Sequence, residues 1–169
     1  MSANFAYTGK LYRALNPVWA RQPLSGAGAA AYGGRFNARG VAALYCSLSP
    51  VTALREANQV GDLQPTTLVA FDASIAHVFD TRNPDALADH GITANDLASA
   101  DWRDEMLTSR ACATQRLADA LIGTGYHGLL VRSFARGAVA EDLNLVLWRW
   151  GDGPPSRLTV IDDEGRLGN

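Results

Sequence analysis

Three strand-like segments follow one another, with no helical pattern between them, in HGLLVRSFARGAVAEDLNLVLWRWGDGPPSRLTVIDD (127–163). The segments are residues 127–134, 142–150 and 156–163. The middle one is almost wholly apolar, which is typical of a strand at the centre of a sheet. Strands that occur in runs, with helices inserted elsewhere, favour an α+β fold over a regular doubly wound sheet.

The chain upstream of residue 127 supplies the rest of the expected architecture. Its best helical pattern is SRACATQRLADALIGTG (109–125), where one apolar face forms and Gly123 or Gly125 provides the stop. We expect strands at 10–15, 41–48, 66–75 and 77–81, a helix at 49–60 with Ser49 as N-cap, short helices capped by Asn or Thr between 83 and 107, and a long loop without periodicity at 16–40. Together these segments predict a single compact domain over residues 1–169, with a mixed β-sheet core and flanking helices.

Composition excludes several classes of protein. The 169 residues are 47% apolar and 19% charged, which is a globular composition. A formal net charge of −2 argues against direct nucleic-acid binding, which normally needs a basic patch. The chain has no apolar run of about 18 residues that could span a membrane, and its first residues lack the pattern of a signal peptide. We therefore expect a cytoplasmic protein.

The residues that commonly bind metals are scattered. Cys46 and Cys112 are far apart and are interpreted as two small buried hydrophobic residues. His77, His90 and His127 show no metal-ligand spacing. The sequence therefore predicts neither a metal site nor a disulfide.

A carboxylate in the helix at 49–60 is the first candidate for chemistry. Glu56 falls within an apolar stripe formed by Ala53, Ala57 and Val60, whereas Arg55 and its polar neighbours are expected on the opposite side. A carboxylate that faces inward is costly unless it is paired or functional. Glu56 is therefore either a functional residue or a structural one bonded to backbone or to an arginine.

The loop segment YGGRFN (32–37) is the second candidate. Two glycines precede Arg35, and glycine lets a backbone approach a ligand closely. With Asn37 beside it, Arg35 could bind a phosphate or a nucleotide; a plain turn with a solvated arginine explains the motif equally well.

Three polar or aromatic residues in strands complete the candidate set. Tyr45 shares a strand face with small residues that leave room for a flat ligand, although a core tyrosine would look the same. Ser133 and Asn144 interrupt otherwise apolar strands, and both could simply bond to backbone.

The order and spacing of these residues resemble the RES domain, named for its Arg, Glu and Ser residues, which is the toxin half of bacterial RES–Xre toxin–antitoxin pairs. The resemblance extends over about residues 11–150 and is most specific from Gly33 to Glu56. One departure is the connection VRSFARGAVAEDLN (131–144), which is longer and more acidic than the family pattern. The matching pieces are LYRA (Arg13), GGRFNARG (Arg35), ALYCSLSPVTALREAN (Tyr45 and Glu56), VRSFA (Ser133) and DLNLVLW (Asn144).

The resemblance implies a fold related to ADP-ribosyltransferases, NAD⁺ as substrate and no metal. Breaking the nicotinamide–ribose bond develops positive charge on the ribose, so charge stabilisation and positioning matter more than a strong base. Glu56, Arg35 and Ser133 are then the expected catalytic residues, with Glu56 holding the ribose and stabilising the cation. The expected NAD⁺-binding residues are Arg13 and Arg35 at the pyrophosphate, Tyr45 stacked on a ring, Tyr32 covering the site, Ser133 orienting an amide or phosphate, and Asn144.

The same resemblance implies a partner. It would be a cognate Xre-like antitoxin that blocks the NAD⁺ pocket, and any DNA binding would belong to the complex. Three hypotheses stay open: an NAD⁺ glycohydrolase or phosphorylase, with water or phosphate as acceptor; an ADP-ribosyltransferase that modifies a protein target; and a non-enzymatic binding module in which Glu56 and arginines form a structural network.

Overall fold

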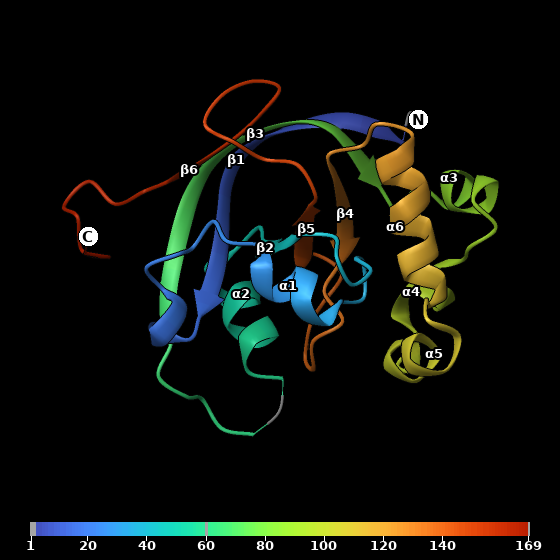
Figure 1. The fold of residues 1–169 in the computed structure, drawn as a ribbon, viewed down its shortest axis with the longest axis horizontal. Helices are drawn as coiled ribbons and strands as arrows, with labels where there is room; N and C mark the ends of the chain where they lie inside the picture. Colours follow the sequence, from blue (N-terminus) through green and yellow to red (C-terminus); the bar gives the residue numbers. More distant parts are fainter. Residues whose placement is uncertain (1–2, 60, 169) are drawn as a thin grey trace.

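A six-stranded mixed sheet with flanking helices forms one α+β domain, as predicted (Figure 1). The computed structural model describes residues 3–59 and 61–168. Along the sheet the strands have the order β1-β2-β5-β4-β3-β6. The strands are β1 (Asn4–Leu15), β2 (Leu44–Ser47), β3 (Thr67–Asp80), β4 (Gly128–Arg132), β5 (Leu143–Leu147) and β6 (Ser156–Val160), and the helices are η1 (Pro17–Trp19), α1 (Ala27–Tyr32), α2 (Pro50–Ala57), α3 (Pro84–Asp89), α4 (Ala94–Ala98), α5 (Trp102–Ser109) and α6 (Ala113–Gly123).

The sheet curves back on itself. Strand β1 pairs with β2 at Tyr12 and also pairs along its length with β3, so β1, β2, β5, β4 and β3 form a closed ring of pairings. Among the pairings between named strands in residues 3–59 and 61–168, β3–β4 is parallel and the others are antiparallel. Strand β5 lies between β2 and β4, which confirms its predicted central place.

Strand β3 is one continuous strand, whereas the sequence predicted two that break near residue 76. Between the pairs Phe5–Val78 and Tyr7–Ile75, β3 contains one more residue than β1. His77 lies in this bulge with φ at 53°. A β-bulge absorbs the extra residue without ending the strand, and the break in alternation therefore marks the bulge rather than a turn.

The predicted loop at 16–40 contains two short helices, so that expectation was wrong in part. Asn16 caps η1 by accepting a hydrogen bond from Val18 N, and the alanine-rich segment Ala27–Tyr32 forms α1. Alanine has the highest helix propensity, which favours this single turn and a half despite the absence of an amphipathic pattern.

Helix α2 begins as predicted but buries a different face. The Ser49 side chain accepts a hydrogen bond from Thr52 N, and Pro50 occupies the first turn. Thr52 and Ala53 are buried, whereas Ala57 is exposed. Val60 lies outside the described residues. The expected stripe therefore holds only at Ala53.

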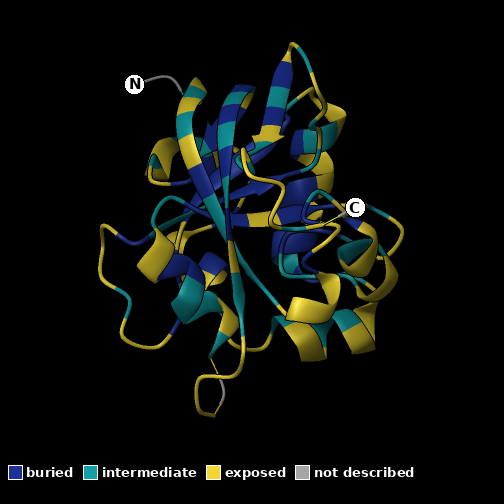
Figure 2. Cartoon of the chain, turned by 90° about the vertical axis from the view of Figure 1, so that its left-hand side faces the viewer, coloured by how far each residue is buried: buried dark blue, intermediate teal, exposed yellow. Residues whose placement is uncertain are grey.

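Two apolar clusters lie on opposite faces of the central strands. In β5, Leu145 and Leu147 belong to one cluster, whereas Val146 packs into the other with Leu117 and Leu121 of α6. Buried residues follow the strands, and exposed ones cover the outer helix surfaces (Figure 2). Helices α3–α6 gather at one end of the sheet (Figure 1). In residues 3–59 and 61–168, no helix has the length and apolar character needed to cross a bilayer.

Candidate active site

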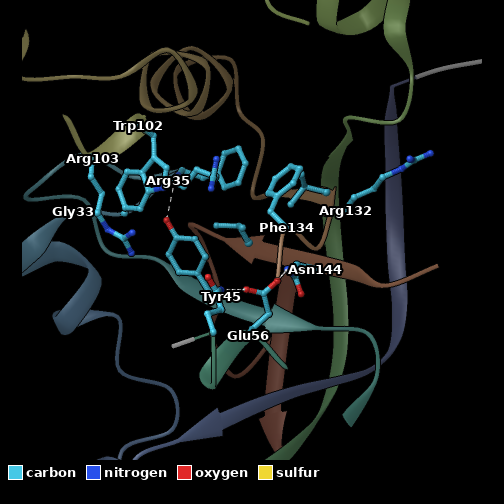
Figure 3. A pocket seen from close by; sticks show the side chains of 14 residues that line it. Gly33, Arg35, Tyr45, Glu56, Trp102, Arg103, Arg132, Phe134 and Asn144 are labelled. Atoms are coloured by element: carbon cyan, nitrogen blue, oxygen red, sulfur yellow. Dashed lines mark hydrogen bonds between the residues drawn. The ribbon is translucent and has the colours of Figure 1, made fainter. Parts of the chain in front are cut away.

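A pocket of about 320 Å³ opens where α2, β2, β5 and the end of β4 meet (Figure 3). The segment after α1 and the start of α5 supply its other walls. It is lined by Gly33, Gly34, Arg35, Phe36, Tyr45, Glu56, Gln59, Trp102, Arg103, Val131, Arg132, Phe134, Asn144 and Val146.

The Glu56 carboxylate is held by three hydrogen-bond donors. Its Oε1 accepts from Ser133 Oγ and from Asn144 Nδ2, each at 2.5 Å. Its Oε2 accepts from Gln59 Nε2 at 2.7 Å. Because three donors approach the two oxygens, they fix the orientation of the carboxylate.

Asn144 is itself oriented by a residue on the neighbouring strand. Ser47 Oγ donates to Asn144 Oδ1 at 2.7 Å, and the two residues are paired between β2 and β5. With its oxygen engaged by Ser47, the amide presents its NH₂ group to Glu56. Ser133 Oγ also accepts from Ala135 N at 3.2 Å. The alternative of bonding to backbone therefore holds for Ser133 alongside its bond to Glu56, whereas Asn144 bonds to the side chains of Glu56 and Ser47.

Tyr45 holds the loop that carries Arg35. Its hydroxyl accepts from Phe36 N at 3.0 Å and donates to Asn37 Oδ1 at 2.6 Å. Asn37 in turn donates to Ala29 O and Val41 O. Tyr45 is 36% exposed, whereas its hydroxyl is enclosed by these bonds, and burial raises the pKa of Tyr45. Its hydroxyl thus orders the 33–37 loop, and its ring lines the pocket.

Arg35 lies between two aromatic rings. Its guanidinium carbon is 5.6 Å from the Trp102 ring centroid and 4.9 Å from that of Phe134 (Figure 3). Its Nη1 donates to Leu97 O at 2.9 Å and to Ser99 O at 2.7 Å. Burial lowers the pKa of Arg35, but an arginine stays charged. The charge therefore sits at the pocket wall and also ties the end of α4 to the site.

Arg13 and Tyr32 lie elsewhere. They line a second pocket of about 540 Å³, and neither lines the Glu56 pocket. Arg13 Nη1 donates to Pro23 O at 2.7 Å, and Tyr32 is 75% exposed and lines the same pocket as Trp19. The two pockets are lined by consecutive residues, Tyr32 and Gly33, at the end of α1.

Several pocket residues are not among those predicted from the sequence. Gln59, one of the polar neighbours of Arg55 expected opposite Glu56, lies just beyond the end of α2 and donates to Glu56. Residues three apart are neighbours on the helix predicted at 49–60, so the spacing could have revealed this contact. Trp102 and Arg103 come from a region of short helices whose docking no local pattern predicts. Phe134 adjoins Ser133, and Arg132, on the same segment, points away from Glu56 (Figure 3).

The fold and the pocket define a class: a small α+β domain in which a helix glutamate is fixed by side chains from two adjacent strand segments. The chain belongs to the RES-domain family, whose model, described as RES domain, matches residues 10–168. The resemblance seen in the sequence is thereby confirmed.

Comparison with solved structures gives the same fold. The chain is similar to the MbcT toxin in the crystal structure of the M. tuberculosis MbcT–MbcA toxin–antitoxin complex, with a TM-score of 0.66 and 21% identity. The match covers 94% of this chain and 84% of that one. A comparison with curated proteins found no match.

Proposed function

We propose that this protein consumes NAD⁺ in the Glu56 pocket, cleaving the nicotinamide–ribose bond and passing ADP-ribose to an acceptor. The observation that carries the proposal is the Glu56 carboxylate, which hydrogen bonds from Ser133, Asn144 and Gln59 hold in a fixed orientation at the pocket wall. A fixed negative charge stabilises the positive charge that develops on the ribose as nicotinamide departs, and it costs no reorganisation during the reaction.

In this mechanism the acceptor forms a new bond to ribose C1′ as the bond to nicotinamide breaks. Nicotinamide leaves with the bonding electron pair as a neutral molecule. A hydroxylic acceptor must lose its proton, and Glu56 lies where it could take that proton or pass it to solvent. Tyr45 and Phe134 offer aromatic surfaces against which the nicotinamide ring could stack.

The size of the Glu56 pocket supports a binding site in which two pockets each take one part of NAD⁺. About 320 Å³ lies at the low end for ligand pockets, so we assign this pocket to the nicotinamide riboside half of NAD⁺. The second pocket, with the partly buried cation of Arg13 and the exposed ring of Tyr32, would take the rest of the dinucleotide. Arg35 would approach the pyrophosphate through nitrogens other than Nη1, which donates to the Leu97 and Ser99 carbonyls.

The biological role we propose is that of a cytoplasmic toxin in a toxin–antitoxin pair. The RES-domain family and the fold shared with a chain of a toxin–antitoxin complex support it. Its partner would be a cognate Xre-like antitoxin that occludes the NAD⁺ pocket. A protein target for ADP-ribosylation remains an alternative acceptor to water or phosphate.

The test is to incubate the purified protein with NAD⁺ and to follow nicotinamide release together with labelled ADP-ribose. We expect release by the wild type and a loss of about 100-fold or more in Glu56→Gln, which keeps the shape but removes the charge. Glu141→Gln is the matched control, because Glu141 is exposed and lies outside the pocket. The destination of the label, small molecule or protein, identifies the acceptor.

The non-enzymatic hypothesis makes the opposite prediction. A structural network would pair Glu56 with arginines, yet within residues 3–59 and 61–168 the ion pairs leave Glu56 out. A binding module would release no nicotinamide, and Glu56→Ala would strongly destabilise its fold. No release from inhibitor-free protein, with and without phosphate or cell extract, would exclude the enzyme.

A further inference from the structure

We propose that Asp142 is a positioning residue for the reaction, because it fixes helix α2, and with it Glu56, against the two segments that carry Ser133 and Asn144. The inference rests on the proposed function. It concerns a residue that does not line the Glu56 pocket and that the sequence did not single out.

On the helix side, the Asp142 carboxylate contacts two residues of α2. Its Oδ1 accepts from Thr52 Oγ1 and its Oδ2 from Arg55 Nη1, each at 2.7 Å. Arg55 immediately precedes Glu56, and Thr52 lies one turn earlier. Two bonds that approach different oxygens restrict both the rotation and the sliding of the helix, which a single contact would not do.

On the strand side, the main chain of Asp142 bonds to one partner of Glu56 and leads directly to another. Its carbonyl accepts from Ser133 N at 2.8 Å, and its position in the chain is two residues before Asn144. Its Oδ2 also accepts from Val139 N at 2.8 Å, which closes the turn leading into β5. One residue therefore sets the distance between the carboxylate of Glu56 and both side chains that donate to its Oε1.

Burial makes this link stiff. Asp142 is 9% exposed, and hydrogen bonds from Val139 N and Thr52 Oγ1, with the Arg55 charge, hold the pKa of Asp142 below its ordinary value. The ion pair itself is only partly buried, because the Arg55 side chain is 39% exposed. Such a pair is weak evidence for stability, but it can select one arrangement of the elements that it joins. Catalytic groups need placement to within about 0.5 Å, so a small shift of α2 would separate Glu56 from its donors.

The chain offers a matched pair whose side-chain hydrogen bonds join its two members to each other and not to α2. Arg82 Nη2 is 2.7 Å from Asp80 Oδ2, the same separation as between Arg55 and Asp142, at the far end of β3. Neither Asp80 nor Arg82 lines the Glu56 pocket. Asp80→Asn therefore shows how much activity is lost when an Arg–Asp ion pair is broken at a place that does not hold α2.

The experiment measures kcat and KM for nicotinamide release from NAD⁺ in the wild type, Asp142→Asn and Asp80→Asn. It repeats Asp142→Asn in a Glu56→Gln background. We expect Asp142→Asn to lower kcat about tenfold or more with KM changed less than about threefold, and to lower the residual rate of Glu56→Gln less than about twofold, because a residue that acts through Glu56 has nothing left to position. Asp80→Asn should keep the wild-type kcat.

Two results would overturn the inference while the wild type still releases nicotinamide. One is a kcat of Asp142→Asn within twofold of the wild type. The other is an equal fold loss in both backgrounds, which would mean general damage to the fold. A wild type without release would instead refute the proposed function, and the inference with it. Should Asp142→Asn fail to fold, Arg55→Met breaks the same link from the helix side and carries the same expectations.

Discussion

Asn144 donates a hydrogen bond of 2.5 Å to Glu56, across a separation of 88 residues in the sequence. The contact joins the central strand β5 to helix α2, and Ser47 fixes the amide so that its NH₂ group faces the carboxylate. A neutral donor in this position orients the Glu56 carboxylate without adding positive charge that would repel a developing cation on the ribose. The choice of an amide, rather than an arginine, therefore agrees with the chemistry proposed for the pocket.

Replacing this donor with an acceptor should shift the pH dependence of the reaction. In Asn144→Asp two carboxylates would face each other, and like charges so close share a proton rather than both ionising. We expect the acid limb of the kcat profile to move to higher pH, so that the rate falls at neutral pH and recovers as pH rises. Asn144→Ala, which removes the donor without adding charge, is the control. An unchanged acid limb in Asn144→Asp would contradict the proposed contact.

A methyl group at residue 34 should disturb the loop that carries Arg35. A Cβ on Gly34 would lie 2.5 Å from Tyr45 Oη and 2.6 Å from Asn37 Oδ1, the two atoms that hold the loop. We expect Gly34→Ala to lower the free energy of unfolding by about 1–3 kcal/mol, and the NAD⁺ KM to rise. Urea unfolding and initial rates measure the two effects.

A control for that substitution comes from another helix. A Cβ on Gly123, the last residue of α6, would have no neighbouring atom within 4 Å, so Gly123→Ala should leave stability unchanged or raise it slightly. Adding Tyr45→Phe to Gly34→Ala removes one clashing oxygen and should recover part of the loss. If the double variant were less stable by the full sum of the single effects, the steric explanation would fail.

Local patterns in the sequence predicted most elements of the fold. The apolar run around Leu145, the N-cap at Ser49 and the amphipathic face of α6 each arise from neighbours in the chain, and all three are confirmed. The bulge at His77 has the pattern of a strand end, because alternation alone does not distinguish an inserted residue from a turn.

The site was predictable where a residue breaks an apolar pattern. Glu56, Ser133 and Asn144 were identified in this way, and the structure brings them together. Trp102 and Asp142 reach the site through contacts with residues far away in the sequence, Arg35 and Arg55. The residues next to them in the sequence show no pattern that predicts these contacts. Arg13 lies in the second pocket because of the path that the chain follows through η1 and α1. That segment has no periodic pattern from which its path could be predicted.

Removing Arg35 should loosen the segment that carries Trp102. Arg35 Nη1 donates to the carbonyls of Leu97 and Ser99, and α5 contains no buried residue of its own to hold it in place. We expect Arg35→Ala to increase amide hydrogen exchange across residues 97–109 while α6 keeps its protection. Arg39→Ala is the control, because Arg39 is exposed and its Nε donates a long hydrogen bond of 3.4 Å to Tyr32 O. Equal exchange in both variants would show that Arg35 does not anchor the segment.

The stability that Asp142 contributes should depend on pH in one direction. Its pKa in the folded protein lies below the ordinary aspartate value of 3.8, because Val139 N, Thr52 Oγ1 and Arg55 favour the ionised form. A folded-state pKa that is depressed gives stability that is present above the unfolded value and is lost as pH falls through the folded value. The difference in the free energy of unfolding between the wild type and Asp142→Asn should therefore stay constant from about pH 7 to pH 5 and shrink below about pH 4. Urea unfolding of both proteins across this range measures it. A difference that persists unchanged at about pH 3 would mean that the carboxylate contributes through its shape and not through its charge.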